Sequence, residues 1–332
     1  MKAKHVWWST AALVTAGAVA ATAALGVKIQ RTYDHLDHGE PYTPAAAETL
    51  VQPVEVEQVD AAALKKRLDE LGKNEALGTF GAQVIDTKTH EVVWEREPAK
   101  PLTPASATKV LTVAAATLAL DEEERITTEV LKGEKDGEVV IKVAGDVWLT
   151  EERLDELAEQ IKQKMGTVSR VSIDTSAWAG PDQAPGWDDD NIDGGYVAPI
   201  QPAMLYGGRI EEKTGDVPRS HEPALDVARA LAARLGTDKA DIAAVPAGAE
   251  VIASSDSEPL ALRAQQAIKD SDNVMAEAIA RELASHERAE ASFEGAAKTT
   301  LDVLEHNGID VSGVVLKDGS GLSRDNRIPA GV

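Results

Sequence analysis

Ser106-Ala107-Thr108-Lys109 opens an almost continuous apolar run that extends to Leu120. Residues three apart share a helix face, so the hydroxyl of Ser106 and the amine of Lys109 can meet. Burial lowers the pKa of a lysine, because the charged form loses its hydration. A neutral amine beside an alcohol is a general base beside a nucleophile. The stretch therefore predicts acyl-transfer chemistry.

The apolar run predicts a buried helix over residues 104–120, because a helix that is apolar on all sides normally lies inside a protein. Thr103 is the expected N-cap and Pro104 the expected first helical residue. An alternative is a plain helix end whose lysine extends to water. A Ser-x-x-Lys spacing is also common by chance, so further motifs have to support the catalytic interpretation.

Composition excludes several classes of function. The chain has 332 residues, with a formal net charge of −22 and 43% hydrophobic residues, which is enough for a sizeable core. The acidic balance argues against nucleic acid as a partner, since phosphate binding needs a basic surface. There is no cysteine, so disulfides and thiolate sites are impossible. The seven histidines show no H-E-x-x-H pattern, so we expect no metal site.

The N-terminus predicts export. Lys2 and Lys4 precede an apolar segment from Val6 to Val27, which is typical of a signal peptide. The segment is also long enough to be an uncleaved membrane anchor, and the sequence leaves both alternatives open. We expect residues 1–31 to be this signal or anchor and the proline-containing residues 32–58 to be a linker.

Helical and strand patterns alternate along the rest of the chain and predict an α/β or α+β fold. Amphipathic periodicity predicts helices at 60–72, 149–166, 222–235, 260–269, 274–285 and 292–305. Short β-rich runs predict strands at 80–86, 91–95, 139–143, 168–173 and 314–316. Residues 178–208 are expected to be a long irregular loop. We expect a subdomain at 125–255 to be inserted between two parts of one domain, 59–124 and 256–332.

Ser271-Asp272-Asn273 is a second candidate motif, at an expected helix start. Taken alone it is most simply a capping cluster, because Ser, Asp and Asn are the preferred N-cap residues. Together with Ser106 and Lys109 it matches the S-x-x-K and S-D-N pair of penicillin-binding proteins and class A β-lactamases.

With these motifs the chain resembles the class C low-molecular-mass penicillin-binding proteins, the D-alanyl-D-alanine carboxypeptidase/endopeptidase family. The resemblance extends from about Ala62 to Pro329. It rests on segments similar to family motifs: Pro104–Lys109, Val143–Asp146, Pro185–Trp187, Tyr196–Pro199, Ser271–Asn273 with Ala276-Glu277, and Asp318–Arg324. A class A β-lactamase is the weaker match, because its first two motifs lie close together whereas Ser106 and Ser271 are widely separated.

The resemblance implies a role for each motif residue. Ser106 would attack the carbonyl between two D-alanines, and Lys109 would accept its proton. Ser271 would relay a proton to the leaving amine, and Asn273 would hold the substrate amide and orient Lys109. The residues implied to bind substrate are Asp318, Gly319, Ser320 and Gly321. The resemblance implies that no metal or cofactor is required.

The implied function is an exported serine-type D-Ala-D-Ala carboxypeptidase or endopeptidase with a transpeptidase-like fold, acting on peptidoglycan. Its partners would be peptidoglycan peptide stems and β-lactam antibiotics, which would acylate Ser106. Contact with a membrane is expected only through residues 6–27, and the protein is expected outside the cell or in the cell envelope.

The third family motif is the main departure. The Lys-Thr-Gly at residues 213–215 precedes Ser271 and lacks a strand pattern, so we expect it not to be catalytic. The sequence ends at Val332, just past the Asp318 motif, so we expect the catalytic domain to be truncated, with its C-terminal strands missing. The alternatives are a truncated or degenerate non-catalytic relative that binds the cell wall, and an exported domain of unrelated function.

Overall fold

The computed structural model describes residues 24–31 and 60–332. Residues 24–31 form a short exposed helix, and the rest of the expected leader and linker lies outside the described residues. Within the described ranges, no helix is long and apolar enough to cross a membrane. Residues 60–332 form one compact unit, which is described below by itself.

The unit begins with a helix packed on a β-hairpin. Helix α2 (Ala61–Leu71) is capped by Asp60, whose carboxylate accepts the N–H groups of Ala62 and Ala63. A 3₁₀ turn, η1 (Glu75–Leu77), leads into the antiparallel pair β1 (Ala82–Ile85) and β2 (Val92–Arg96), as the sequence predicts. The indole N–H of Trp94 on β2 donates to Asp69 on α2 at 2.9 Å, which ties the helix to the hairpin.

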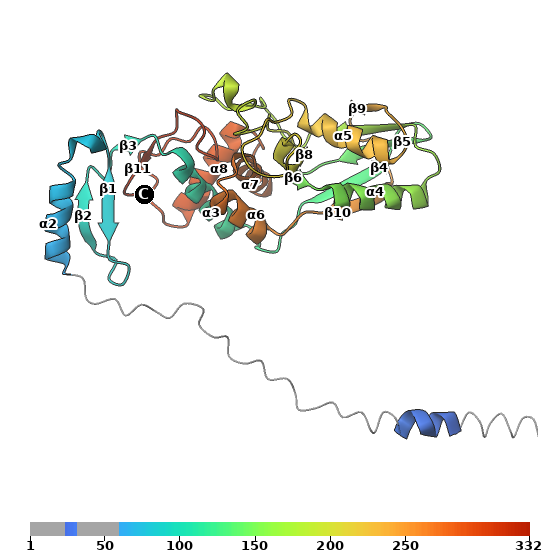
Figure 1. The fold of residues 1–332 in the computed structure, drawn as a ribbon, viewed down its shortest axis with the longest axis horizontal. Coiled ribbons are helices and arrows are strands. Elements are labelled where there is room, and N and C mark those ends of the chain that lie inside the picture. The colour runs from blue at the N-terminus through green and yellow to red at the C-terminus, as the bar shows by residue number, and fades with distance from the viewer. Residues whose placement is uncertain (1–23, 32–59) are drawn as a thin grey trace, which may run out of the picture. The chain divides into compact units, whose positions relative to one another are not determined.

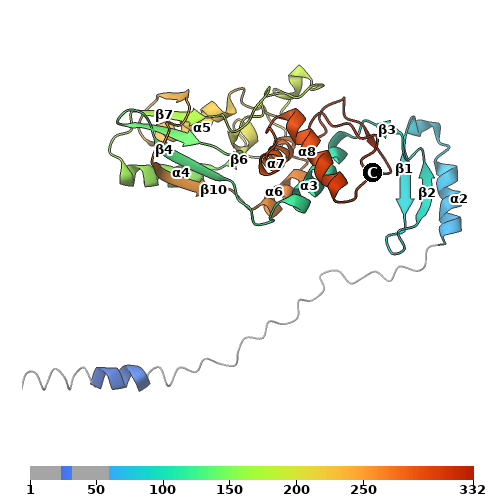
Figure 2. The same ribbon diagram turned by 180° about the vertical axis from the view of Figure 1, so that it is seen from behind.

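Four helices pack together in the middle of the unit (Figures 1 and 2). They are α3 (Thr108–Ala119), α6 (Leu260–Lys269), α7 (Asn273–His286) and α8 (Phe293–His306). Small residues at their contacts allow close packing, with Ala115, Ala116 and Ala276 completely buried. The last three helices lie where the periodicity predicts them.

The start of α3 differs from the prediction. Residues Ala105–Ala107 form a separate 3₁₀ turn, η2, because Ala105 has a positive φ of 49°, which a right-handed helix does not allow. Thr103 is not the cap: its hydroxyl accepts a hydrogen bond from Arg327 at 3.1 Å, and Ala107 occupies the N-cap position. Pro104 precedes η2 rather than opening α3.

The prediction that this helix is buried on all sides is also wrong. The side facing the neighbouring helices is buried, but Val110 and Leu118 on α3 are 58% and 49% exposed. Only one stripe of α3 therefore belongs to the core.

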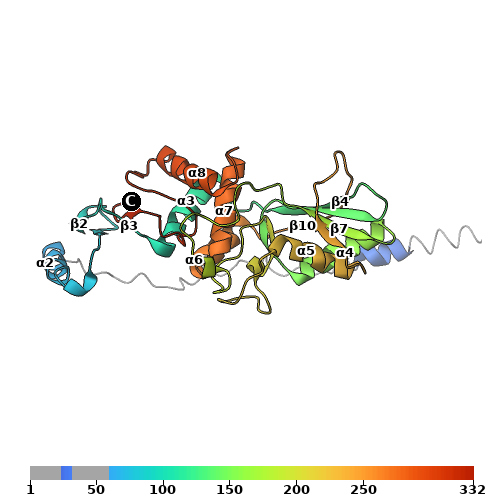
Figure 3. The same cartoon turned by 90° about the horizontal axis from the view of Figure 1, so that it is seen from above.

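Beside the four helices, the unit contains a five-stranded mixed sheet with the order β10-β4-β5-β7-β9. The first three strands are antiparallel neighbours, and β5, β7 and β9 run parallel. The strands are β4 (Thr127–Lys132), β5 (Glu138–Lys142), β7 (Arg170–Asp174), β9 (Ala240–Ile242) and β10 (Val251–Asp256). Helices α4 (Glu151–Lys164) and α5 (Pro223–Arg234) contact each other and lie on the same side of the sheet (Figure 3). Thr150 caps α4 by accepting the N–H of Arg153.

The predicted irregular loop at 178–208 contains some regular structure. It includes the 3₁₀ turns η3 (Asp189–Asn191) and η4 (Tyr206–Gly208) and the strand β8 (Ala203–Leu205). Strand β8 pairs in parallel with β6 (Asp146–Leu149), so the segment is tied to the sheet region at its end.

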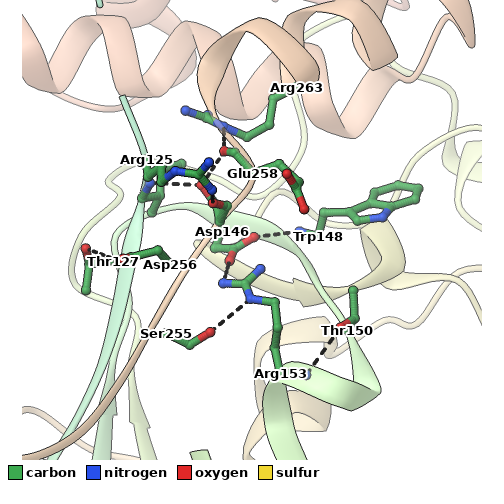
Figure 4. A network of polar contacts seen from close by, with 12 residues as sticks. Arg125, Thr127, Asp146, Trp148, Thr150, Arg153, Ser255, Asp256, Glu258 and Arg263 are labelled. Atoms are coloured by element: carbon green, nitrogen blue, oxygen red, sulfur yellow. Dashed lines mark hydrogen bonds and ion pairs between the residues drawn. The ribbon is translucent and has the colours of Figure 1, made fainter. Parts of the chain in front are cut away.

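A polar network lies where the chain crosses between the helices and the sheet (Figure 4). Asp146, which is 2% exposed, accepts the N–H of Trp148 at 3.0 Å and pairs with Arg153 at 2.5 Å. Arg153 also donates to Ser255 on β10 at 3.0 Å. Arg125 donates to the carbonyl of Ser257 at 2.7 Å. These bonds hold the chain that enters β4, and helix α4, against the end of β10.

The structure also differs from the prediction near residue 315. The predicted strand at 314–316 does not form; Val315 makes only an isolated bridge with Arg327. The loop between these two residues curls around the Asp318 carboxylate, which accepts the N–H groups of Gly321 and Ser323. A two-residue strand, β11 (Ile328–Pro329), then pairs with β3 (Pro101–Leu102).

The predicted mixed class of helix and sheet is confirmed. The sheet lies in the segment expected as the inserted subdomain, and the helical layer is built from chain on either side of it. The domain boundaries at 59–124, 125–255 and 256–332 stay a prediction.

Candidate active site

The two serine motifs come together where η2 meets the start of α7. Ser106 is exposed on η2, and Ser271 precedes α7. Their hydroxyl oxygens are 2.9 Å apart, so the two alcohols are hydrogen-bonded. Ser271 has a positive φ of 54°, a conformation that costs a residue other than glycine about 1–3 kcal/mol. The fold thus stabilises a strained backbone at the point where the second hydroxyl reaches the first.

Lys109 is buried beneath Ser106, with 1% of its surface exposed. Its Nζ lies 3.2 Å from the Ser106 Oγ, 2.6 Å from the Asn273 Oδ1 and 2.8 Å from the Ser320 carbonyl oxygen. A neutral amine has two N–H groups and one lone pair. The amide and carbonyl oxygens can only accept, so they take both N–H groups and direct the lone pair at the Ser106 hydroxyl.

Burial lowers the pKa of Lys109, because the charged ammonium loses its water. The negative charges of Glu277, Asp272 and Asp318 oppose this effect and raise the pKa in part. The net direction is downward, which favours the uncharged amine.

Asn273 is fixed in one orientation at the first turn of α7. Its Nδ2 donates to the carbonyl of Tyr196 at 2.9 Å, so its Oδ1 faces Lys109. Asp272 is the N-cap of α7 and accepts the N–H of Met275 at 2.9 Å. A buried ion pair of 3.0 Å between Asp272 and Arg209 holds this helix end from the opposite side.

The segment Asp318–Gly321 lies under the site rather than at its surface. Asp318 is 1% exposed and accepts N–H groups from Gly321 at 2.9 Å and Ser323 at 2.6 Å. It also accepts the amide of Asn326 and the indole N–H of Trp187. The role of these four residues in binding substrate stays a prediction, and their burial favours a role in positioning Lys109 through the Ser320 carbonyl.

Gly321 allows this segment to touch the turn that carries Ser106. A Cβ at Gly321 would lie 1.9 Å from the carbonyl oxygen of Ala105, and its φ is 86°. Both the space and the backbone conformation require glycine here.

Sequence reasoning named Glu277, Trp187 and Tyr196 only as parts of motif segments and assigned them no role in the site. Glu277 had a detectable signal, since it is a lone carboxylate in the apolar stretch from Val274 to Ala280. The motif at 185–187 was noted, but its contact with Asp318 was not. The contact of a backbone carbonyl with Asn273 carries no sequence signal.

The Lys-Thr-Gly at residues 213–215 lies in an exposed loop. Lys213 Nζ lies 4.8 Å from the centroid of the Tyr206 ring and 3.9 Å from Glu152. Within the described residues, no cluster of three or more His, Asp or Glu side chains could hold a metal ion.

Known proteins share this fold. The solved structure of penicillin binding protein 4 from Haemophilus influenzae matches with a TM-score of 0.65 at 20% identity, covering 82% of this chain and 76% of that one. A second structure of that protein, in complex with a β-lactam, matches with a TM-score of 0.56 at 19% identity, covering 82% and 75%. The fold is therefore that of a penicillin-binding protein with an inserted domain.

Sequence comparison gives the family. The model of the D-Ala-D-Ala carboxypeptidase 3 (S13) family matches residues 64–218 and 211–332. Carboxypeptidase DacB of Mycolicibacterium smegmatis is 40% identical, covering 99% of this chain and 75% of that protein. Carboxypeptidase Rv3627c of Mycobacterium tuberculosis is 41% identical, covering 81% of this chain and 62% of that protein. The chain belongs to the S13 family of serine-type D-Ala-D-Ala carboxypeptidases, as its motifs predict.

Proposed function

We propose that this protein removes or cleaves at D-alanine in peptidoglycan peptides through an acyl-enzyme on Ser106. The observation that carries the proposal is the environment of Lys109, a buried amine with two fixed acceptors and the Ser106 hydroxyl as its third neighbour. This arrangement prepares a base and a nucleophile before substrate arrives. Membership of a carboxypeptidase family supports the choice of substrate.

In the acylation step, the Ser106 Oγ attacks the carbonyl carbon of the penultimate D-alanine and its proton passes to Lys109. The C–N bond to the terminal D-alanine then breaks. The leaving amine receives a proton through Ser271, whose hydroxyl lies 2.9 Å from the Ser106 oxygen. Water hydrolyses the ester in the second step and restores the Ser106 hydroxyl. A carboxypeptidase releases D-alanine in this way, and an endopeptidase releases the amine side of a cross-link.

Two finer points belong to the same proposal. β-Lactams would acylate Ser106, since their amide resembles the D-Ala-D-Ala bond, and a β-lactam complex of the penicillin binding protein 4 from Haemophilus influenzae has been solved. The protein would act outside the cytoplasmic membrane, where peptidoglycan lies. The basic and apolar start of the sequence, from Lys2 to Val27, supports export.

Intact-protein mass spectrometry with benzylpenicillin tests the proposal. The wild-type chain should gain the mass of one penicillin, and peptide mapping should place it on Ser106. Ser106→Ala should gain none, and the matched control Ser176→Ala, at an exposed turn outside the site, should behave as wild type. An adduct that persists in Ser106→Ala contradicts the assignment of the nucleophile. Peptidoglycan binding by the wild type with no adduct contradicts the enzyme and supports a non-catalytic cell-wall protein.

Release of D-alanine from a pentapeptide ending in D-Ala-D-Ala completes the test. Free D-alanine should appear with the wild type and Ser176→Ala, and not with Ser106→Ala. A cross-linked dimer of stems, assayed beside it, distinguishes endopeptidase from carboxypeptidase activity.

A further inference from the structure

Helix α7 contains a fully buried carboxylate, Glu277, that the mechanism above does not use. Glu277 is 1% exposed and lies among buried apolar neighbours on the same helix, Val274, Ala276, Ala278 and Ala280. A buried carboxylate costs several kcal/mol unless it is well hydrogen-bonded, so its position calls for a specific set of partners.

Those partners are backbone N–H groups of the segment beneath the site. Both carboxylate oxygens of Glu277 lie 3.0 Å from the Gly319 nitrogen, and the Oε1 accepts the N–H of Ser320 at 2.8 Å. Thr112 on α3 donates to the Gly319 carbonyl at 2.7 Å, so the segment is held from two helices.

One residue therefore connects Glu277 to the amine of Lys109. The N–H of Ser320 points to Glu277, and its carbonyl oxygen accepts from Lys109 at 2.8 Å. If the N–H lost its acceptor, Thr112 alone would hold this peptide from the helices, and the carbonyl that directs the Lys109 lone pair would be less tightly fixed.

We propose that Glu277 is a positioning residue for Lys109, which fixes the Ser320 carbonyl by its hydrogen bonds to the Gly319 and Ser320 N–H groups. This inference rests on the proposed function, in which Lys109 is the base that activates Ser106. The hydrogen bonds of Glu277 go to Gly319 and Ser320 and not to Ser106, so it acts through Ser320.

The charged groups around this pair come from three elements. Lys109 is on α3, Asp318 is in the loop that follows α8, and Asp272 and Arg281 are at the cap and in the third turn of α7. Burial raises the pKa of Glu277 to about 7; Asp318 adds to the increase, while the Ser320 and Gly319 hydrogen bonds and Arg281 oppose it.

The sign of the coupling follows from these charges. An ionised Glu277 raises the pKa of Lys109, because it stabilises the ammonium form. A neutral residue at 277 removes that stabilisation, so the pKa of Lys109 falls further. The pH at which acylation reaches half of its maximum should fall with it.

Glu277→Gln is the test variant, and Glu282→Gln is its matched control. Glu282 is on the same helix but pairs with Arg263 at 2.9 Å, away from Lys109. The rate of benzylpenicillin acylation would be measured by rapid-quench mass spectrometry from pH 5 to 10 for both variants and the wild type. In Glu277→Gln we expect the midpoint to fall by about one pH unit and the maximal rate to drop about tenfold. In Glu282→Gln we expect the wild-type midpoint.

Glu277→Asp separates charge from position and also serves if the glutamine variant does not fold. Its shorter side chain keeps the charge but withdraws from Ser320, so the maximal rate should fall with little change in the midpoint. A folded Glu277→Gln with the wild-type midpoint and rate overturns the inference while the acyl-enzyme on Ser106 stands. A wild-type protein that forms no adduct overturns the proposed function and this inference with it.

Discussion

The site and the five-stranded sheet are built on opposite principles. The sheet region buries a core of branched aliphatic side chains, including Val139, Ile141, Leu157 and Ile173. The site buries polar and charged groups: Lys109, Thr112, Asp272, Glu277, Arg281, Asp318, Ser320, Ser323 and Asn326. The first arrangement stabilises through transfer of apolar surface. The second costs desolvation, which hydrogen bonds and ion pairs compensate except at the Nε and Nη2 of Arg281, which have no hydrogen-bond partner among the described residues. The difference shows that the site, unlike the sheet, is less stable than an apolar core would be, because it holds polar groups in fixed positions.

The largest expected effect comes from removing the base. Lys109→Met keeps the length of the side chain but cannot accept the Ser106 proton. We expect acylation by benzylpenicillin to slow by about 10²–10⁴-fold, the usual contribution of general base catalysis. Stopped-flow kinetics measures the rate, and circular dichroism confirms that the variant is folded. Acylation at the wild-type rate in a folded variant contradicts the role of Lys109.

The sheet should show the reverse pattern. Ile173 on β7 is completely buried, so Ile173→Ala removes apolar contacts and leaves a cavity. We expect the free energy of unfolding to fall by about 2–5 kcal/mol. Urea denaturation measures this loss, and the acylation rate of the folded variant should equal that of the wild type. A parallel fall in the acylation rate would show that the sheet and the site are coupled.

The same substitution, glycine to alanine, can be made at Gly321 in the site and at Gly236 in the sheet region. Both have positive φ, 86° and 78°, but a Cβ at Gly321 would lie 1.9 Å from the Ala105 carbonyl oxygen, whereas nothing lies within 4 Å at Gly236. We expect Gly321→Ala to destabilise by about 2–4 kcal/mol and to slow acylation, and Gly236→Ala to cost about 1–2 kcal/mol with no change in rate. Equal losses in thermal unfolding would contradict the close packing of this segment on the Ser106 turn.

The smallest expected effect concerns strain at Ser271. Ser271→Ala and Ser271→Gly both remove the hydroxyl that bonds Ser106, so both should slow acylation to the same extent. Glycine accepts the positive φ of 54° without strain, so Ser271→Gly should be more stable than Ser271→Ala by about 1 kcal/mol. Chemical denaturation measures the difference. A less stable glycine variant would show that the backbone is not strained there.

Local patterns predicted much of the fold. The helices after residue 256, the helix capped by Thr150 and the β1–β2 hairpin follow from periodicity and capping, which are properties of neighbouring residues. The predictions failed where contacts between distant parts of the chain determine the local structure. Thr103 pairs with Arg327 instead of capping α3, and Val315 makes a single bridge with Arg327 instead of a regular strand.

The sequence likewise predicted the main residues of the site but not the contacts that position them. The proximity of Ser106 and Lys109 follows from their spacing, and their approach to Ser271 and Asn273 rests on the family resemblance. The contacts of Glu277 with Gly319 and Ser320 depend on how α7 packs against a segment about 40 residues further along the chain, which spacing cannot provide. The roles of Ser106, Lys109, Ser271 and Asn273 stay predictions until acylation is measured.

Titration of Lys109 by NMR tests the central claim most directly, which is that burial lowers the pKa of its amine beside Ser106. The intact protein would carry ¹³C at the ε-carbon of lysine, and Lys109→Met would assign the signal by its absence. We expect the Lys109 signal to titrate below the ordinary lysine value of about 10.4. A Lys109 amine that titrates at or above that value would contradict the account.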